Sequence, residues 1–195
     1  MSAANGSLGA AGGRIDDAEL ARRARRVEWL LLDVDGVFTD GRLYYSAAGE
    51  ELKAFHVRDG LGVELARRAG LKVGLLSGRS SRALERRARD LSLDAVILGH
   101  SEKAAAFERF VAERGTAPAR VAFAGDDLLD LPVMLRCGLA FAPADACDEV
   151  RRHAHRVLAA PGGGGAVREI VETVLRARGE WERLVAGYTA LVAAT

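Results

Sequence analysis

The stretch VEWLLLDVDGVFTDG, residues 27–41, carries the clearest fold signal in the chain. Its first six residues form a nearly continuous apolar run, which is typical of a parallel strand buried on both faces. Two carboxylates, Asp33 and Asp35, follow at once, and Gly36 permits a tight bend that brings backbone amides close to a bound anion. An Asp-rich turn has the same composition, so the meaning of the stretch depends on the rest of the chain.

Similar apolar runs recur beyond this stretch, and segments with helical spacing lie between them. The expected strands after 27–32 are 71–76, 95–98, 121–124 and 139–141, and the expected helices are 61–69, 80–90, 102–114, 128–136 and 166–178. This alternation predicts an α/β fold in which helices cover both faces of a parallel sheet. Residues 42–57 differ, because aromatic and β-branched residues flank a turn-like AAGE, and they predict a projecting β-hairpin.

The 195 residues suffice for one well-buried domain with short extensions. We expect a disordered or helical extension over 1–24, the domain itself over 25–179 and a helical tail over 180–195. No signal peptide or membrane-spanning run is expected, and a net charge of +1 provides no strong field for nucleic acid. Neither Cys137 nor Cys147 belongs to a CxxC pair, which favours a reducing cytoplasm.

Polar residues that directly follow the apolar runs are the candidates for a site, since the carboxyl ends of parallel strands meet at one edge of a sheet. The segment LLSGRS offers the Ser77 hydroxyl to phosphate oxygens, and backbone N–H groups at Gly78 and Gly36 would contact the same anion. A serine there is also a common helix cap. Arg58 and Arg79 lie beside strand ends, and we expect them to bind a substrate carboxylate or hydroxyls, because arginine makes bidentate contacts.

Lys103 lies in the first turn of an expected helix, after Ser101 as its N-cap. The helix dipole disfavours a cation at that position unless an anion lies nearby. Of 28 basic residues only three are lysines, at positions 53, 72 and 103, so arginine serves wherever a generic cation suffices. This scarcity favours a required compact ammonium at Lys103. Chance survival is the alternative reading, and Lys53 and Lys72 are assigned to it.

The segment AGDDLLD, residues 124–130, places Asp126 and Asp127 after another apolar run and Asp130 one turn later. Carboxylates this close repel one another unless a cation compensates. Oxygen ligands without a supporting Cys or His indicate Mg²⁺ rather than zinc, and EF-hand spacing for calcium is missing.

In order and spacing, DVDGVFTDG, LLSGRS, Lys103 and AGDDLLDLPVM resemble the four motifs of the haloacid dehalogenase superfamily. Residues 25–179 further resemble the subfamily that includes 3-deoxy-D-manno-octulosonate 8-phosphate phosphatase. The resemblance implies a Rossmann-like core in which Asp33 becomes a phosphoaspartate and Asp35 is general acid and then base. It also implies phosphate binding by Ser77 and Lys103, Mg²⁺ binding by Asp33, the Asp35 carbonyl and Asp126, and support from Asp127 and Asp130.

No separate cap domain fits, because a hairpin, a helix and a strand already fill the interval between Asp33 and Ser77. Phosphoryl transfer benefits from a covered site, so we expect the hairpin of a neighbouring subunit to cover it, and the resemblance implies that the assembly is a homotetramer. The glycine run 162–165 is either a flexible connector or a hinge that lets the tail and Arg168 reach an active site. His56 either faces the substrate or is structural.

The resemblance implies Mg²⁺-dependent hydrolysis of 3-deoxy-D-manno-octulosonate 8-phosphate, a step in lipopolysaccharide biosynthesis. Two alternatives stay open at this point. One is a phosphatase for a related nine-carbon sialic-type 9-phosphate, since the same scaffold can accept it with changed contacts. The other is a non-catalytic oligomerising subunit, against which the presence of every motif residue counts.

Overall fold

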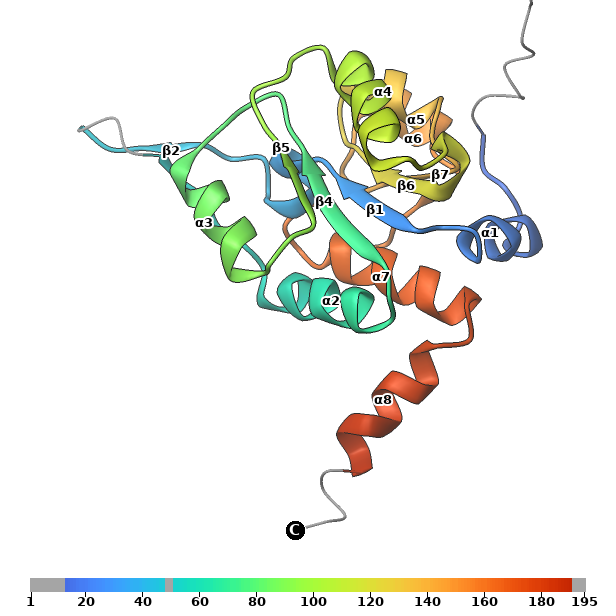
Figure 1. Ribbon diagram of the computed structural model, residues 1–195. Coiled ribbons are helices and arrows are strands. Elements are labelled where there is room, and N and C mark those ends of the chain that lie inside the picture. The colour runs from blue at the N-terminus through green and yellow to red at the C-terminus, as the bar shows by residue number, and fades with distance from the viewer. Residues whose placement is uncertain (1–12, 48–50, 191–195) are drawn as a thin grey trace, which may run out of the picture.

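A parallel six-stranded sheet forms the centre of the computed structural model, which describes residues 13–47 and 51–190 (Figure 1). The strand order is β5-β4-β1-β6-β7-β8, so β1 and β6 lie in the middle. The bounds are β1 Trp29–Leu32, β4 Lys72–Leu76, β5 Ala95–Ile97, β6 Val121–Ala124, β7 Leu139–Ala142 and β8 Arg156–Val157. The expected α/β fold is confirmed. Strand β8 was not expected, because two residues are too few to produce an apolar run.

Helices cover both faces of the sheet (Figure 1). Strand β1 has an apolar side chain on each face, with Leu30 and Leu32 in one core and Trp29 and Leu31 in the other. Helices α1, α2, α3 and α7 pack on the first core, and α4, α5 and α6 on the second. Their bounds are α1 Asp17–Ala24, α2 Val57–Arg68, α3 Arg82–Asp90, α4 Lys103–Arg114, α5 Leu131–Met134, α6 Asp148–His153, α7 Ala166–Ala177 and α8 Trp181–Ala190. Within the described ranges, no helix combines the length and apolar content that crossing a membrane requires.

Helix α2 begins four residues before the expected start at 61 and takes over the end of the expected hairpin. His56 caps it, because its Nδ1 accepts the backbone N–H of Arg58 at 3.2 Å. This contact supports the structural reading of His56. Gly60, in the first turn, obscured the start of the helix in the sequence, whereas Gly62 lies inside the expected helix. Close packing explains Gly62, because a Cβ there would lie 3.1 Å from Cα of Arg168 in α7.

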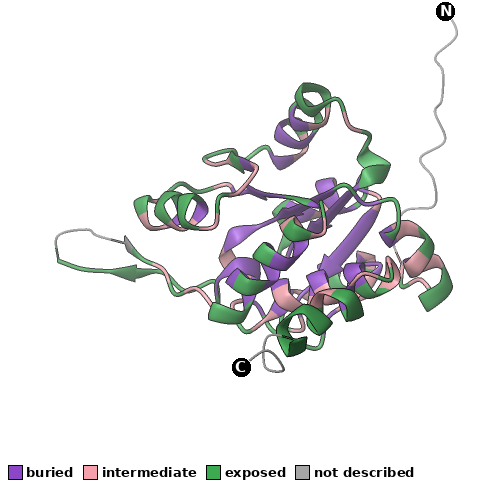
Figure 2. Cartoon of the chain, turned by 60° about the horizontal axis from the view of Figure 1, so that its bottom comes forward, coloured by how far each residue is buried: buried purple, intermediate pink, exposed green. Residues whose placement is uncertain are grey.

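The expected hairpin is present in the described residues as two short antiparallel strands, β2 Tyr44–Tyr45 and β3 Glu51–Leu52. It projects from the body of the molecule, and its arms are coloured as exposed in Figure 2. Tyr45 and Leu52 are each 63% exposed, which leaves an apolar surface without cover on this chain. Most of the expected AAGE turn, positions 48–50, lies outside the described residues.

Both extensions contact the domain where they are described. Leu20 and Ala24 of α1 are buried in the core against α7, and so is Trp181 at the start of α8. Residues 1–12 and 191–195, on which part of the expected disorder and part of the expected last helix fall, lie outside the described residues. The proposed division at 24/25 and 179/180 stays a prediction, although α1 shares the core of the domain that follows it.

The two readings of the glycine run 162–165, a flexible connector or a hinge, stay predictions, but its first two glycines pack closely against the loop after β1. A Cβ on Gly162 would lie 1.9 Å from the carbonyl oxygen of Gly36, and one on Gly163 would lie 2.4 Å from the backbone nitrogen of Asp40. Glycines are needed here because this loop packs backbone to backbone against the loop after β1. Arg168 does not turn toward that loop: its side chain binds Glu172 at 2.7 Å and lies over the ring of Trp181.

His155, next to β8, is buried as a neutral hydrogen-bond acceptor. Its Nδ1 accepts the backbone N–H of Ala140 at 2.8 Å, and it is only 7% exposed. Burial first, and then the positive charge of Arg23, lower the pKa of His155 to about 4. The unfolded side chain takes up a proton below about pH 6.5, whereas the folded one stays neutral.

The contribution of His155 to stability should therefore be complete above pH 6.5 and decline as the pH falls toward 4. Urea unfolding of wild type and His155→Asn, which keeps an acceptor near the Nδ1 position, measures it. We expect the stability difference between them to shrink by about 2 kcal/mol from pH 7 to pH 4.5. A difference that stays constant over this range would show that the ring is protonated equally in both states.

Candidate active site

The site residues meet at the carboxyl ends of three adjacent strands, β4, β1 and β6. Asp33 directly follows β1, Ser77 follows β4, and Gly125 and Asp126 follow β6. The central strand β1 pairs in parallel with β4 and β6, so these residues are brought to one edge of the sheet. The convergence expected from the apolar runs is observed.

A buried lysine joins two carboxylates at the centre of the site. Lys103 Nζ lies 2.7 Å from Asp33 Oδ1 and 2.6 Å from Asp130 Oδ1. All three residues are at most 5% exposed. These anions explain a cation in the first turn of α4, which the helix dipole alone would disfavour. Glu102 rather than Ser101 occupies the N-cap position, without a side-chain cap, so the expected Ser101 cap is wrong.

Asp130 orients its neighbours through its second oxygen. Asp130 Oδ2 accepts the backbone N–H groups of Asp126 at 2.9 Å and Asp127 at 3.2 Å. Asp127 has a different role in the described contacts: its side chain accepts the N–H of Leu128 and caps the short turn Leu128–Asp130. Of the two aspartates expected to support the site, only Asp130 contacts Lys103 in the described contacts.

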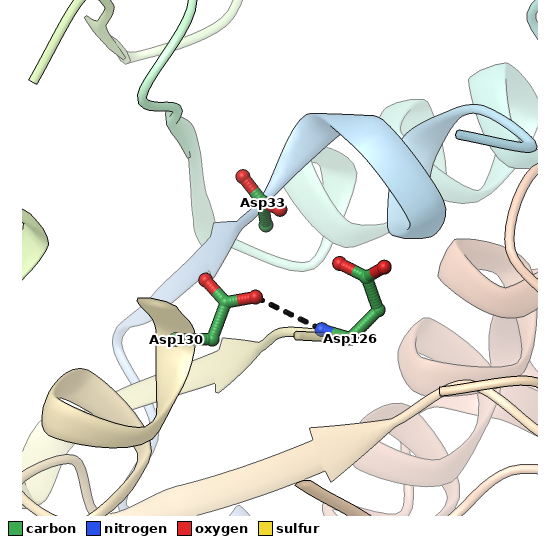
Figure 3. A group of neighbouring side chains, drawn as sticks. All are labelled: Asp33, Asp126 and Asp130. Carbon is green, nitrogen blue, oxygen red and sulfur yellow. Dashed lines mark hydrogen bonds between the residues drawn. The ribbon is translucent and has the colours of Figure 1, made fainter. Parts of the chain in front are cut away.

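Three carboxylates form a compact acidic cluster (Figure 3). One oxygen from each of Asp33, Asp126 and Asp130 lies within 4.8 Å of the others. Two glycines make room for them, because a Cβ on Gly36 would lie 1.9 Å from Asp126 Oδ2, and one on Gly125 would lie 2.3 Å from Cβ of Asp130. Gly36 has a φ of 86°, which glycine adopts without strain.

Burial and mutual repulsion disfavour negative charge in this cluster. Burial and then the charge of Asp130 raise the pKa of Asp33 to about 7, although Lys103 opposes the rise. Burial and then the charges of Asp33 and Asp130 raise the pKa of Asp126 to about 8. Lys103 supplies one positive charge to three carboxylates. An oxygen-only donor set with excess negative charge suits a hard divalent cation such as Mg²⁺.

Mg²⁺ should therefore stabilise the fold more at high pH than at low pH. A carboxyl whose pKa is raised in the fold holds a proton that the unfolded chain has released, so without metal these two groups cost stability as the pH rises from about 4 to 8. Mg²⁺ offsets that cost by replacing the protons. We expect the increase in Tm on adding Mg²⁺, measured against EDTA, to be larger at pH 8 than at pH 5.5. An equal increase at both pH values would contradict the carboxylate site.

Asp35 lies beside this cluster and faces two other cations, Lys53 and Arg79. Lys53 Nζ lies 2.5 Å from Asp35 Oδ1, and Arg79 Nε lies 3.7 Å from Asp35 Oδ2. Arg79 also donates to the hydroxyl of Tyr45 at 2.9 Å. Sequence reasoning missed Lys53 by attributing its survival to chance. The scarcity of lysine that singled out Lys103 was the signal that also applied to Lys53.

The loop after β4 brings Ser77 to the same edge. Ser77 is 2% exposed, and its Oγ accepts the backbone N–H of Arg79 at 3.2 Å, which shapes the turn through Gly78. The helix cap is a different residue, since Ser81 Oγ accepts the N–H of Leu84. Arg58 is exposed in the first turn of α2, and no described contact joins it to the carboxylates.

Comparisons with known proteins give consistent relatives. The chain is 41% identical over 161 residues to the 3-deoxy-D-manno-octulosonate 8-phosphate phosphatase KdsC of Haemophilus influenzae, covering 83% of this chain and 89% of that protein. A probable YrbI family phosphatase from Pseudomonas syringae is 39% identical, with a TM-score of 0.86. The match covers 88% of this chain and 98% of that protein. The 3-deoxy-D-manno-octulosonate 8-phosphate phosphatase of Moraxella catarrhalis was solved in complex with magnesium, phosphate and 3-deoxy-D-manno-octulosonate (KDO). It is 32% identical with a TM-score of 0.85, and the match covers 87% of this chain and 98% of that protein. No family model matches the chain.

Proposed function

Because the chain belongs to the family of 3-deoxy-D-manno-octulosonate 8-phosphate phosphatases, we propose that it hydrolyses this sugar-acid phosphate to KDO and inorganic phosphate. The observation that carries the proposal is the buried contact of Asp33 with Lys103, beside Asp126 at the end of the central strands. The relatives support the choice of substrate: they are named for this reaction, and the Moraxella catarrhalis protein was solved with KDO, phosphate and magnesium.

The first step is attack by the Asp33 carboxylate on phosphorus. A bond forms between Asp33 and phosphorus while the bond from phosphorus to the sugar oxygen breaks, and the Asp35 carboxyl gives its proton to that oxygen. Lys103 and the Ser77 hydroxyl hold the phosphate oxygens, with backbone N–H groups at Gly36 and Gly78.

In the second step, water attacks the phosphorus of the Asp33 acyl phosphate. Asp35 takes a proton from that water, the bond between Asp33 and phosphorus breaks, and inorganic phosphate leaves. Asp33, Asp126 and the carbonyl of Asp35 would hold Mg²⁺, which when bound neutralises charge on the phosphate and the carboxylates. Asp130, whose two oxygens already accept from Lys103 and two amides, supports this arrangement.

Recognition of the sugar acid and cover of the site belong to the same proposal. Arg79, beside Asp35, and Arg58 at the start of α2 would bind the carboxylate or hydroxyls of the substrate. The exposed apolar arms of the hairpin, which include Tyr45 and Leu52, support a homotetramer in which each hairpin covers a neighbour's site. Two free cysteines are consistent with the cytoplasm, where the product would enter lipopolysaccharide biosynthesis.

A phosphate-release assay tests the substrate assignment. The purified protein is supplied with 3-deoxy-D-manno-octulosonate 8-phosphate or with a nine-carbon sialic-type 9-phosphate, each with and without Mg²⁺. We expect Mg²⁺-dependent turnover with kcat/KM at least about tenfold higher for the eight-carbon substrate, since discrimination is the ratio of these constants. A higher value for the nine-carbon substrate would overturn the assignment, and no turnover with any phosphate would overturn the activity.

A further inference from the structure

Two buried ammonium groups each bind one carboxylate of the Asp33–Asp35 pair. Lys103 binds Asp33 at 2.7 Å, and Lys53 binds Asp35 at 2.5 Å. The side chain of Lys53 is 1% exposed, although the neighbouring Leu52 is 63% exposed. Desolvating an ammonium is unfavourable unless it is paired at close range, so the buried position of Lys53 depends on such pairing.

The third lysine provides a contrast within the same chain. Lys72 is exposed at the surface, and its ammonium lies 5.2 Å from the ring centroid of Trp29. Where an exposed cation is enough, this chain almost always uses arginine, since only three of its 28 basic residues are lysines. Two of these three occupy buried positions against the Asp33–Asp35 pair, where a compact point charge fits better than a planar guanidinium.

Both arms of the hairpin are linked to Asp35, one directly and the other through Arg79. Lys53 directly follows β3 and contacts Asp35 Oδ1, while Tyr45 of β2 binds Arg79, which lies 3.7 Å from Asp35 Oδ2. Each carboxylate oxygen therefore faces a cation that the hairpin supplies or contacts. A side chain held at both oxygens has little rotational freedom, and a proton donor must keep its direction toward the departing oxygen.

We propose that the base of the hairpin positions Asp35, with Lys53 as the main positioning residue and the Tyr45–Arg79 contact as the second. The inference rests on the proposed function in one respect, namely that Asp35 exchanges the proton with the leaving oxygen. The inference adds that the contacts between the base of the hairpin and Asp35 control proton transfer, in addition to any cover that the hairpin provides.

A comparison of two substrates with different leaving groups distinguishes this role of Lys53 from a general loss of structure. A sugar alkoxide needs the proton from Asp35, whereas p-nitrophenolate leaves without one. We expect Lys53→Met, which keeps the length of the side chain, to lower kcat for the sugar phosphate about 100-fold with KM nearly unchanged. The same variant should lose less than about threefold in the rate at which p-nitrophenolate is released in the first turnover of p-nitrophenyl phosphate, because only the later hydrolysis of the Asp33 acyl phosphate needs Asp35 for that substrate. Lys72→Met is the matched control and should match wild type on both substrates.

A double-mutant cycle with Asp35→Asn completes the test. If Lys53 acts through Asp35, then Lys53→Met should have no further effect on kcat in the Asp35→Asn background. Equal losses on both leaving groups, full additivity in the cycle, or no loss in Lys53→Met would each overturn the proposal. If wild type rejects the eight-carbon substrate, the assignment fails separately; the same comparison then uses any alkyl phosphate that it hydrolyses, because every alkoxide needs that proton.

Discussion

Asp33→Asn should lose at least about 10⁴-fold in kcat for the sugar phosphate while remaining folded. The amide cannot attack phosphorus, and Asp130 does not replace Asp33, because Lys103 and two backbone amides engage its oxygens. Removing the charge also relieves repulsion within the cluster, since burial and neighbouring carboxylates already disfavour ionised Asp33. The Tm measured without Mg²⁺ should therefore not fall with the activity.

Asp90→Asn is the matched control for this variant. Asp90 lies exposed at the end of α3, so the same change of charge there should leave both kcat and Tm within experimental error of wild type. Activity of Asp33→Asn within about tenfold of wild type would mean that the reaction does not pass through this carboxylate.

Lys103→Met should show the largest loss of stability among the site variants. It leaves Asp33 and Asp130 buried without their shared cation, and breaking a buried ion pair on one side costs about 3–5 kcal/mol. We expect that loss in urea unfolding without Mg²⁺, a smaller loss with Mg²⁺, and a fall in kcat of about 10³-fold, because one phosphate contact disappears.

Lys72→Met again gives the comparison. It removes an exposed ammonium near the Trp29 ring and should cost less than about 1 kcal/mol. If Lys103→Met unfolds at the same urea concentration as wild type with and without Mg²⁺, then Lys103 does not compensate the negative charge of the carboxylate cluster. Its position in the first turn of α4 then needs another explanation.

The strands of the six-stranded sheet other than β8 were predictable, because each is an apolar run with turn residues around it. The start of α2 was not, because its cap is a histidine and its first turn holds Gly60, which sequence rules assign to a break. The glycine run 162–165 shows the same limitation. Its composition is that of a flexible connector, and only the backbone contact with Gly36 and Asp40 explains why side chains are absent.

The positions of Asp33, Ser77 and Asp126 followed from one rule, that polar residues after parallel strands share an edge of the sheet. The pairing of Lys53 with Asp35 did not follow from any local pattern, because it depends on how the hairpin folds back onto the loop after β1. Sequence rules locate a residue on an element, but they do not give the direction of a projecting element. This is also why the contact of Tyr45 with Arg79 could not be foreseen.

The central claim is that Asp33 carries the phosphoryl group between the two steps, and trapping that acyl phosphate tests it most directly. Turnover is quenched, the protein is treated with borohydride, which reduces an aspartyl phosphate to homoserine, and the peptide that contains position 33 is sequenced by mass spectrometry. We predict homoserine at position 33 only when substrate and Mg²⁺ are both present. Efficient turnover with unmodified Asp33, or with the label on another carboxylate, would contradict the account.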